Sequence, residues 1–141
     1  MQLSRQVGDT WMVANCHNNL GNVTRGLGDY AAACIQYADS LRTYRDYDDR
    51  WSLAFLFEDI GVLAALTGDA SRALELIGAA DALREAMGAP RAPSLEKEIE
   101  TQLAAGVAGL SDEDRAACRE QGRALELASA IEHALALCEK T

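Results

Sequence analysis

The chain has 141 residues, of which 49% are hydrophobic and 25% charged, so it is long and apolar enough for one compact domain with a buried core. Its net charge of −9 argues against nucleic acid as a direct partner, because binding phosphate requires a basic surface. The charge is uneven. Residues 1–47 are neutral, whereas residues 48–88 and 89–141 carry −5 and −4.

The cysteines and the apolar segments indicate a reduced, cytoplasmic protein. Four cysteines are widely spaced and form no C-x-x-C pair, which favours free thiols over a disulfide framework. The N-terminus lacks an apolar core of signal-peptide length. The most apolar stretch, residues 53–66, is interrupted by Glu58 and Asp59 and is too short to span a bilayer. We therefore expect no membrane association.

The chain contains an internal repeat of 40 residues. Alanine is abundant, and proline and β-branched residues are scarce, which favours helices over strands. A shift of 40 positions produces seven identities in one ungapped register. The identical pairs are Asp9 and Asp49, Trp11 and Trp51, Ala14 and Ala54, Gly21 and Gly61, Gly28 and Gly68, Asp29 and Asp69, and Ala33 and Ala73. So many matches at these residue types indicate two genuine repeat units.

Each unit is predicted to be a helix, a tight turn and a second helix. Gly28 and Gly68 suit the left-handed residue that ends a helix, and the aspartate after each can cap the next helix. Gly21 and Gly61 are expected to let the two helices of a unit approach closely. In the first helix an apolar stripe of helical spacing is expected to face the core. Its members are Ala14, Cys16, Leu20, Val23 and Leu27.

The remainder of the chain is predicted to cap the stack. Pro90 and Pro93 end the fourth helix, and a fifth is expected over about 94–109. Ser111 and the acidic residues after it begin a helix over about 112–124, and a last helix follows over about 126–139. We therefore predict one domain over 1–141, with repeats over about 8–47 and 48–88 and degenerate capping helices over about 92–139.

The repeat resembles the tetratricopeptide repeat, although its period is 40 rather than the usual 34. The matching positions in the two units are His17, Leu20, Gly21, Ala33, Tyr37 and Ser40, and Phe57, Ile60, Gly61, Ala73, Ile77 and Ala80; Thr24 and Ala64 depart from the aromatic of the pattern. The segments 76–90, 122–125 and 130–135 are similar to the C-terminal region of bacterial LuxR-type transcriptional regulators and related signalling ATPases. This resemblance implies an all-α, right-handed stack of antiparallel hairpins, and a sensor region that binds a partner.

A polar strip on the first helix is the candidate binding surface. Asn15, Asn18, Asn22 and Arg25 recur at spacings of three and four, so they share one face, roughly opposite the apolar stripe. They present donors suited to an extended peptide, and the alternative is a solvated helix face. The corresponding positions of the second unit complete the candidate groove; they are Phe55, Glu58 and Val62. A groove of this mixed kind does not suit a simple carboxylate ligand.

The sequence predicts neither an enzyme nor a cofactor or metal site. His17 and Cys16 are assigned to core packing, because no second pair of ligands stands at zinc spacing. The sequence reveals no nucleophile and no oxyanion site that could act together with His133. Trp11 and Trp51 are expected to pack between the units rather than to stack on a ligand. The acidic second half of the chain is expected to form a solvated face.

The expected function is a non-catalytic protein-interaction or sensor module that binds a protein or peptide. By the resemblance it is the C-terminal portion, or a stand-alone relative, of a bacterial transcriptional regulator. One alternative is a small-molecule sensor with an enclosed pocket near Phe55 and Asn22, which relays to an effector domain. Another is a homo-oligomer formed through the face that upstream repeats leave exposed.

Overall fold

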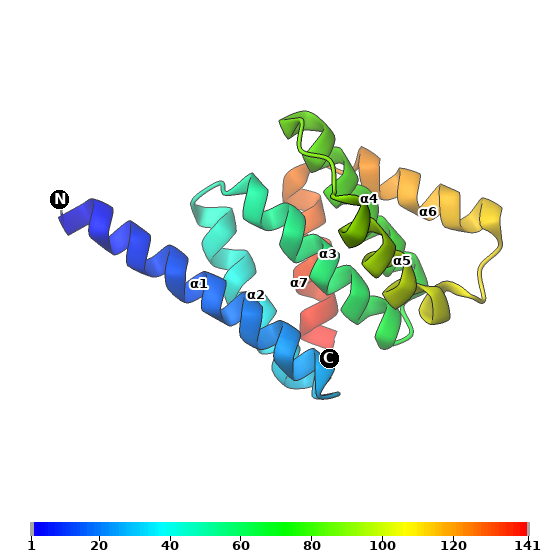
Figure 1. Cartoon of the computed structure of the whole chain (residues 1–141), viewed down its shortest axis with the longest axis horizontal. Coiled ribbons are helices and arrows are strands. Elements are labelled where there is room, and N and C mark those ends of the chain that lie inside the picture. Colours follow the sequence, from blue (N-terminus) through cyan, green and yellow to red (C-terminus); the bar gives the residue numbers. More distant parts are fainter. Residues whose placement is uncertain (1, 141) are drawn as a thin grey trace.

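The computed structural model describes the backbone of residues 2–140 and the side chains of residues 9–139. Met1 and Thr141, the ends of the predicted domain, lie outside that part. In the described chain the regular secondary structure is all helical and no strand occurs, which confirms the all-α prediction (Figure 1). Its helices are α1 (Gln2–Gly26), α2 (Tyr30–Asp46), α3 (Arg50–Leu66), α4 (Ala70–Met87), α5 (Pro93–Val107), α6 (Asp112–Ala124) and α7 (Leu127–Lys140).

Three tight turns of one design connect the first four helices. In each, a residue in the left-handed region precedes an aspartate whose side chain accepts a hydrogen bond from the third N–H of the next helix. The left-handed residues are Gly28, Asp48 and Gly68, with φ of 84°, 50° and 89°, and the capping residues are Asp29, Asp49 and Asp69. The two glycine–aspartate turns confirm the prediction. The turn at Asp48 follows the same plan without glycine.

The helices pack in two successive hairpins, to which the tail adds three further helices. The helix α1 packs against α2, α3 packs against α4, and α2 also contacts α3 (Figure 1). The helix α5 continues the row beside α3, but α6 does not pair with α5 and lies along α4 instead. The helix α7 returns to cover α2 and α4 and also touches α3. As a result, α3 is enclosed on several sides, whereas α1 lies at one end of the molecule.

Glycines set the distances between neighbouring helices, as predicted for Gly21 and Gly61. A Cβ on Gly21 would lie 2.5 Å from the Tyr37 ring of α2, and one on Gly61 would lie 3.2 Å from the Ala73 carbonyl oxygen of α4. The closest approach joins α4 and α6 through a reciprocal pair. A Cβ on Gly122 would lie 1.8 Å from the Glu75 carbonyl oxygen, and one on Gly78 would meet the backbone of α6. Only glycine permits the contacts that Gly78 and Gly122 make with the facing backbone.

The core lies between the hairpins and α7 and centres on α3. Leu53, Leu56, Ile60 and Leu63 of α3 have no exposed surface and belong to one hydrophobic cluster with residues of α2, α4, α5 and α7. This burial accounts for the high apolar content of α3. Within residues 2–140 no helix combines the length and the apolar character that crossing a membrane requires.

Candidate functional site

The polar strip of α1 faces α3 and converges on Asp59. The Nδ2 atoms of Asn18 and Asn22 donate to Asp59 Oδ2 at 2.9 and 3.3 Å. Arg25 Nη1 donates to the Asp59 carbonyl oxygen at 2.9 Å and lies 4.0 Å from its carboxylate. Tyr37 of α2 completes the cluster by donating its hydroxyl to Asn22 Oδ1 at 2.6 Å. These donors are therefore engaged inside the chain, at the junction of the two hairpins.

Burial dominates the electrostatics of this junction. Burial raises the pKa of Asp59 to about 6, although hydrogen bonds from Asn18 and Asn22 and the charge of Arg25 act in the opposite direction. Burial also raises the pKa of the Tyr37 hydroxyl above its ordinary value. The two asparagines thus compensate a carboxylate that the fold holds between α1 and α3, which gives a structural reason for asparagines in a helix.

The remaining residues of the predicted groove lie in different surroundings. Asn15 is exposed on α1, and Val62 is buried on α3. Phe55 is half-buried, with the Trp51 ring at 5.5 Å in an edge-to-face arrangement and the Arg84 guanidinium 4.5 Å above its centre. Partner binding at this set of residues stays a prediction. The structure joins Asn18, Asn22 and Arg25 through Asp59 and leaves Asn15 apart from them.

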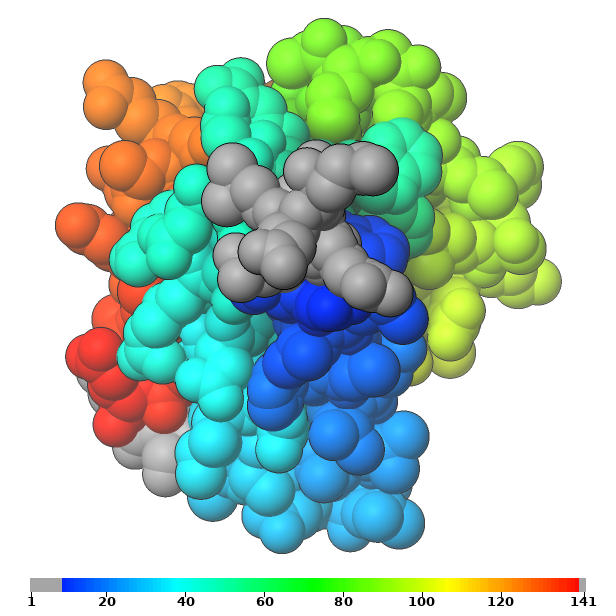
Figure 2. Space-filling model, turned by 90° about the vertical axis from the view of Figure 1, so that its left-hand side faces the viewer, coloured from blue at the N-terminus to red at the C-terminus, as the bar shows by residue number. Residues whose placement is uncertain are grey.

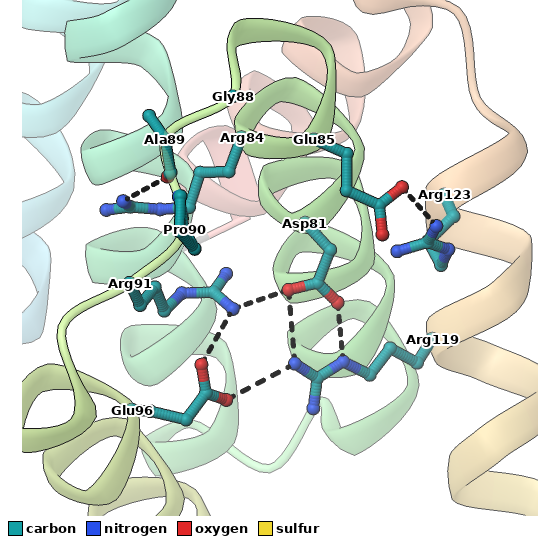
Figure 3. Close-up of a pocket in the computed structure, with 10 residues that line it drawn as sticks. All are labelled: Asp81, Arg84, Glu85, Gly88, Ala89, Pro90, Arg91, Glu96, Arg119 and Arg123. Carbon is teal, nitrogen blue, oxygen red and sulfur yellow. Dashed lines mark hydrogen bonds and ion pairs between the residues drawn. The ribbon is translucent and has the colours of Figure 1, made fainter.

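Glu58 belongs to a buried ion network with α4 and the segment before α5. Its side chain is 3% exposed and accepts hydrogen bonds from Arg84 Nε at 2.7 Å, from Arg84 Nη2 at 3.1 Å and from Arg91 Nε at 2.6 Å. Arg91 also pairs with Asp81 and Glu96 (Figure 3). The solvated acidic face predicted for the second half is therefore wrong for Glu58, which is buried and paired.

Arg119 extends the network to α6. Its Nε donates to Asp81 Oδ2 at 2.6 Å and its Nη2 donates to Asp81 Oδ1 at 3.1 Å (Figure 3). Burial opposes ionisation of Asp81, but the hydrogen bonds from Arg119 and Arg91 outweigh it and lower the pKa of that carboxyl. A cavity of about 390 Å³ adjoins these side chains. Because each arginine in it is matched by a carboxylate, the cluster ties α3, α4, α5 and α6 together.

The apolar stripe of α1 lies on the outer face of this helix, whereas the sequence predicted that the stripe faces the core. The predicted core stripe is wrong, except at Ala14, which is buried. Leu20 is 48% exposed, Val23 is 57% exposed and Leu27 is 78% exposed. Cys16 is also exposed, so its assignment to core packing is wrong as well. The polar strip of α1 faces inward because Asp59 accepts hydrogen bonds from its side chains. The apolar stripe, on the opposite side of the helix, therefore faces outward.

This outer face is uncharged as well as apolar. Residues 10–24 contain no aspartate, glutamate, lysine or arginine, in a chain that is 25% charged. Met12 and Val13 extend the exposed stripe towards the N-terminal end of α1. An open hollow of about 460 Å³ lies along it, lined by Asp9, Met12, Val13, Cys16, His17 and Leu20. Figure 2 looks onto this end of the molecule, where α1 and α2 lie at the surface.

The second hairpin shows what normally covers such a stripe. By the 40-residue shift, Val13, Cys16, Leu20 and Val23 correspond to Leu53, Leu56, Ile60 and Leu63 of α3, all of which are fully buried. Gly61, which approaches α4, lies on another side of α3, and α2 and α7 also pack on this helix. The same sequence pattern is thus covered on α3 and uncovered on α1. The absence of charge over residues 10–24 is the signal that sequence reasoning missed.

Comparisons with known proteins identify no relative. No family model, no curated protein and no solved structure matches the chain.

Other residues singled out in the sequence have local partners. Trp11 Nε1, in the first half of α1, donates to Asp49 Oδ2 at 2.7 Å, which links α1 to the N-terminus of α3, and both tryptophans remain partly exposed. His17 is half-buried with its Nδ1 against the Gln36 amide of α2. The hydrogen bond with the Cys34 thiol and burial raise the pKa of Cys138, so these two cysteines, which are far apart in the sequence, are neighbours in the fold. Among the described side chains, no group of three metal-ligand residues is assembled.

Proposed function

We propose that the chain is a non-catalytic interaction module whose binding surface is the outer face of α1. The single observation that carries the proposal is the exposed, uncharged stripe formed by Val13, Cys16, Leu20 and Val23. Burial of apolar surface drives most protein association, and contiguous exposed apolar patches mark interaction sites. The net charge of −9 lies outside this neutral face, and it repels acidic partners from the rest of the surface. The neutral face is therefore the proposed place of contact.

The ligand proposed for this face is an amphipathic helix. On α3 the corresponding stripe packs on helices, and a stripe with spacings of three and four accommodates the ridge of another helix. Together with the repeat and the row formed by α1, α3 and α5, this supports a tetratricopeptide-like stack of the kind found in the regulators that the sequence resembles. The small-molecule alternative has less support, because Asn22 is held by Asp59 and Tyr37.

The proposal is tested with a peptide that reproduces α2, the helix that packs against α3. A capped peptide of residues 29–47 is titrated into the 15N-labelled chain, and amide shifts are followed by NMR. We expect shifts along residues 12–24 of α1, and their loss in the Leu20→Glu, Val23→Glu double variant. Ile35→Glu is the matched control, because Ile35 is 65% exposed on α2 but lies outside the stripe. Equal binding by the double variant and the control would overturn the proposal.

A further inference from the structure

Residues of α4, α5 and α6 line two adjoining cavities. The helices α5 and α6 both contact α4 but do not pair with each other. The cavities have volumes of about 390 and 370 Å³, which lie within the range of pockets that hold small molecules. Arg119 of α6 belongs to the lining of both. The two cavities therefore meet at this side chain, and together we call them the α4–α6 cleft.

The larger cavity of the cleft has a charged lining with more arginines than carboxylates. Four arginines and three carboxylates line it. Figure 3 shows Arg91 on one side and Arg119 and Arg123 on the other, with their guanidinium groups pointing inward. The fourth arginine, Arg84, is balanced by Glu58, which does not belong to the lining. The surface of this cavity thus suits a ligand with a negative charge.

One nitrogen of Arg91 has no acceptor among the described residues. The Arg91 side chain is only 4% exposed; its Nε donates to Glu58, and its Nη1 donates to Asp81 and Glu96. Its Nη2 is buried and makes no hydrogen bond. Buried polar groups in folded proteins are nearly always hydrogen-bonded, because an unsatisfied one loses its solvation without compensation. This donor, in the wall of a cavity, therefore indicates that the acceptor comes from a ligand.

Glu85 is the carboxylate of this lining that can give way to a ligand. Its side chain is 64% exposed and pairs with Arg123, whose side chain is 30% exposed. Asp81, by contrast, is 11% exposed and is held by both Arg91 and Arg119. A surface ion pair contributes little to stability, so Glu85 can turn into solvent and leave Arg123 to another carboxylate. A ligand with a single negative charge then preserves the charge balance of the cavity.

The smaller cavity of the cleft is mainly apolar. Five apolar side chains line it: Leu74, Leu103, Ala104, Val107 and Ala116. The exposed Glu100 also belongs to this lining, and its charge repels a carboxylate from this end of the cleft. A ligand that fills both cavities therefore has its negative charge at the arginine end and an apolar body at the other.

We infer that the α4–α6 cleft binds an amphiphilic monocarboxylate, which is a carboxylate attached to an alkyl chain. The carboxylate displaces Glu85, accepts hydrogen bonds from Arg119 and Arg123, and provides the acceptor that Arg91 lacks. The alkyl chain lies past Arg119 along the apolar side chains of α4, α5 and α6. This site is separate from the outer face of α1, so the inference does not depend on the proposed function.

The inference is tested with octanoate as the probe. Sodium octanoate is titrated into the 13C- and 15N-labelled chain, below the concentration at which it forms micelles, and the spectra are followed by NMR. We expect shifts of the methyl groups of Leu74, Leu103 and Val107 and of the side-chain N–H groups of Arg119 and Arg123. Acetate, which lacks the chain, should bind at least roughly tenfold more weakly. Octyl phosphate, which carries up to two charges, should also bind more weakly than octanoate.

Three variants examine the two ends of the cleft. Arg123→Gln should weaken octanoate binding roughly tenfold, because a charge-assisted hydrogen bond is lost; Arg42→Gln is the control, since Arg42 also pairs at the surface but lies outside the cleft. Glu85→Gln should tighten binding by up to roughly fivefold, because it removes the competing carboxylate. Ala104→Glu should weaken binding roughly tenfold relative to Ala105→Glu. Both alanines are exposed on α5, but only Ala104 lines the apolar cavity.

The gain in Glu85→Gln is decisive, because a damaged fold would not tighten binding. The inference is overturned if octanoate does not bind at millimolar concentrations, if its affinity is the same in these variants and their controls, or if octyl phosphate binds more tightly. Shifts confined to residues 12–24 would place octanoate on the outer face of α1; they would overturn the inference and agree with the proposed function. Failure of the peptide of residues 29–47 to bind α1 would overturn only the proposed function.

Discussion

Removal of the charge on Glu58 should destabilise the fold strongly, because this carboxylate neutralises two buried arginines. Glu58 is 3% exposed, and the side chains of Arg84 and Arg91 are 6% and 4% exposed. In Glu58→Gln the amide keeps the size of the side chain but cannot balance the Arg84 guanidinium, whose Nε and Nη2 both donate to Glu58. Arg91 retains Asp81 and Glu96. The unpaired charge therefore falls mainly on Arg84.

Breaking a buried ion pair from one side costs about 3–5 kcal/mol, and we expect Glu58→Gln to lower the free energy of unfolding by that amount. Urea unfolding followed by circular dichroism at 222 nm measures it. The control is Asp46→Asn, whose carboxylate pairs with Arg45 at the surface and should matter by less than about 1 kcal/mol. Adding Arg84→Met to Glu58→Gln should cost less than the two single changes together, since it removes the orphaned charge. A loss below about 1 kcal/mol in Glu58→Gln would refute the reasoning.

Three further predictions concern Asp59, Gly122 and Asp48. Folding raises the pKa of Asp59 to about 6, so the folded state binds its proton more tightly; stability should fall by up to about 3 kcal/mol between pH 4 and pH 6 and then level off. The Asp59→Asn variant should lack this fall. If the free energies of unfolding of the two proteins stay parallel from pH 4 to 7, the prediction for Asp59 is contradicted. Gly122→Ala should destabilise by about 1–3 kcal/mol, because its Cβ would enter the backbone of α4. Gly26→Ala, in open space, should be neutral or stabilising in the same thermal melts, and equal losses would refute the packing argument. Asp48→Gly should stabilise by up to about 1 kcal/mol, because φ at this residue is 50°; a lower melting temperature would count against it.

The sequence by itself determined the helices, the turn within each hairpin and the close helix contacts. Local chemistry is enough for these features: Gly28 and Gly68 tolerate positive φ, Asp29 and Asp69 cap the next helix, and Gly21 allows α2 to approach. The helices of the tail were also predictable, because prolines and an acidic start delimit them. None of this depends on which face of a helix meets which neighbour.

Only the tertiary structure decided the orientation of α1. Its sequence has an apolar stripe and a polar strip on opposite sides, and periodicity alone placed the apolar stripe inside. The fold reversed this because Asp59 of α3 gives Asn18, Asn22 and Arg25 hydrogen-bonding partners, while no described helix covers Leu20 and Val23. A stripe is buried only if a neighbour lies over it, and the position of neighbours is a property of the assembled fold. The candidate binding surface therefore emerged from packing that the sequence pattern could not specify.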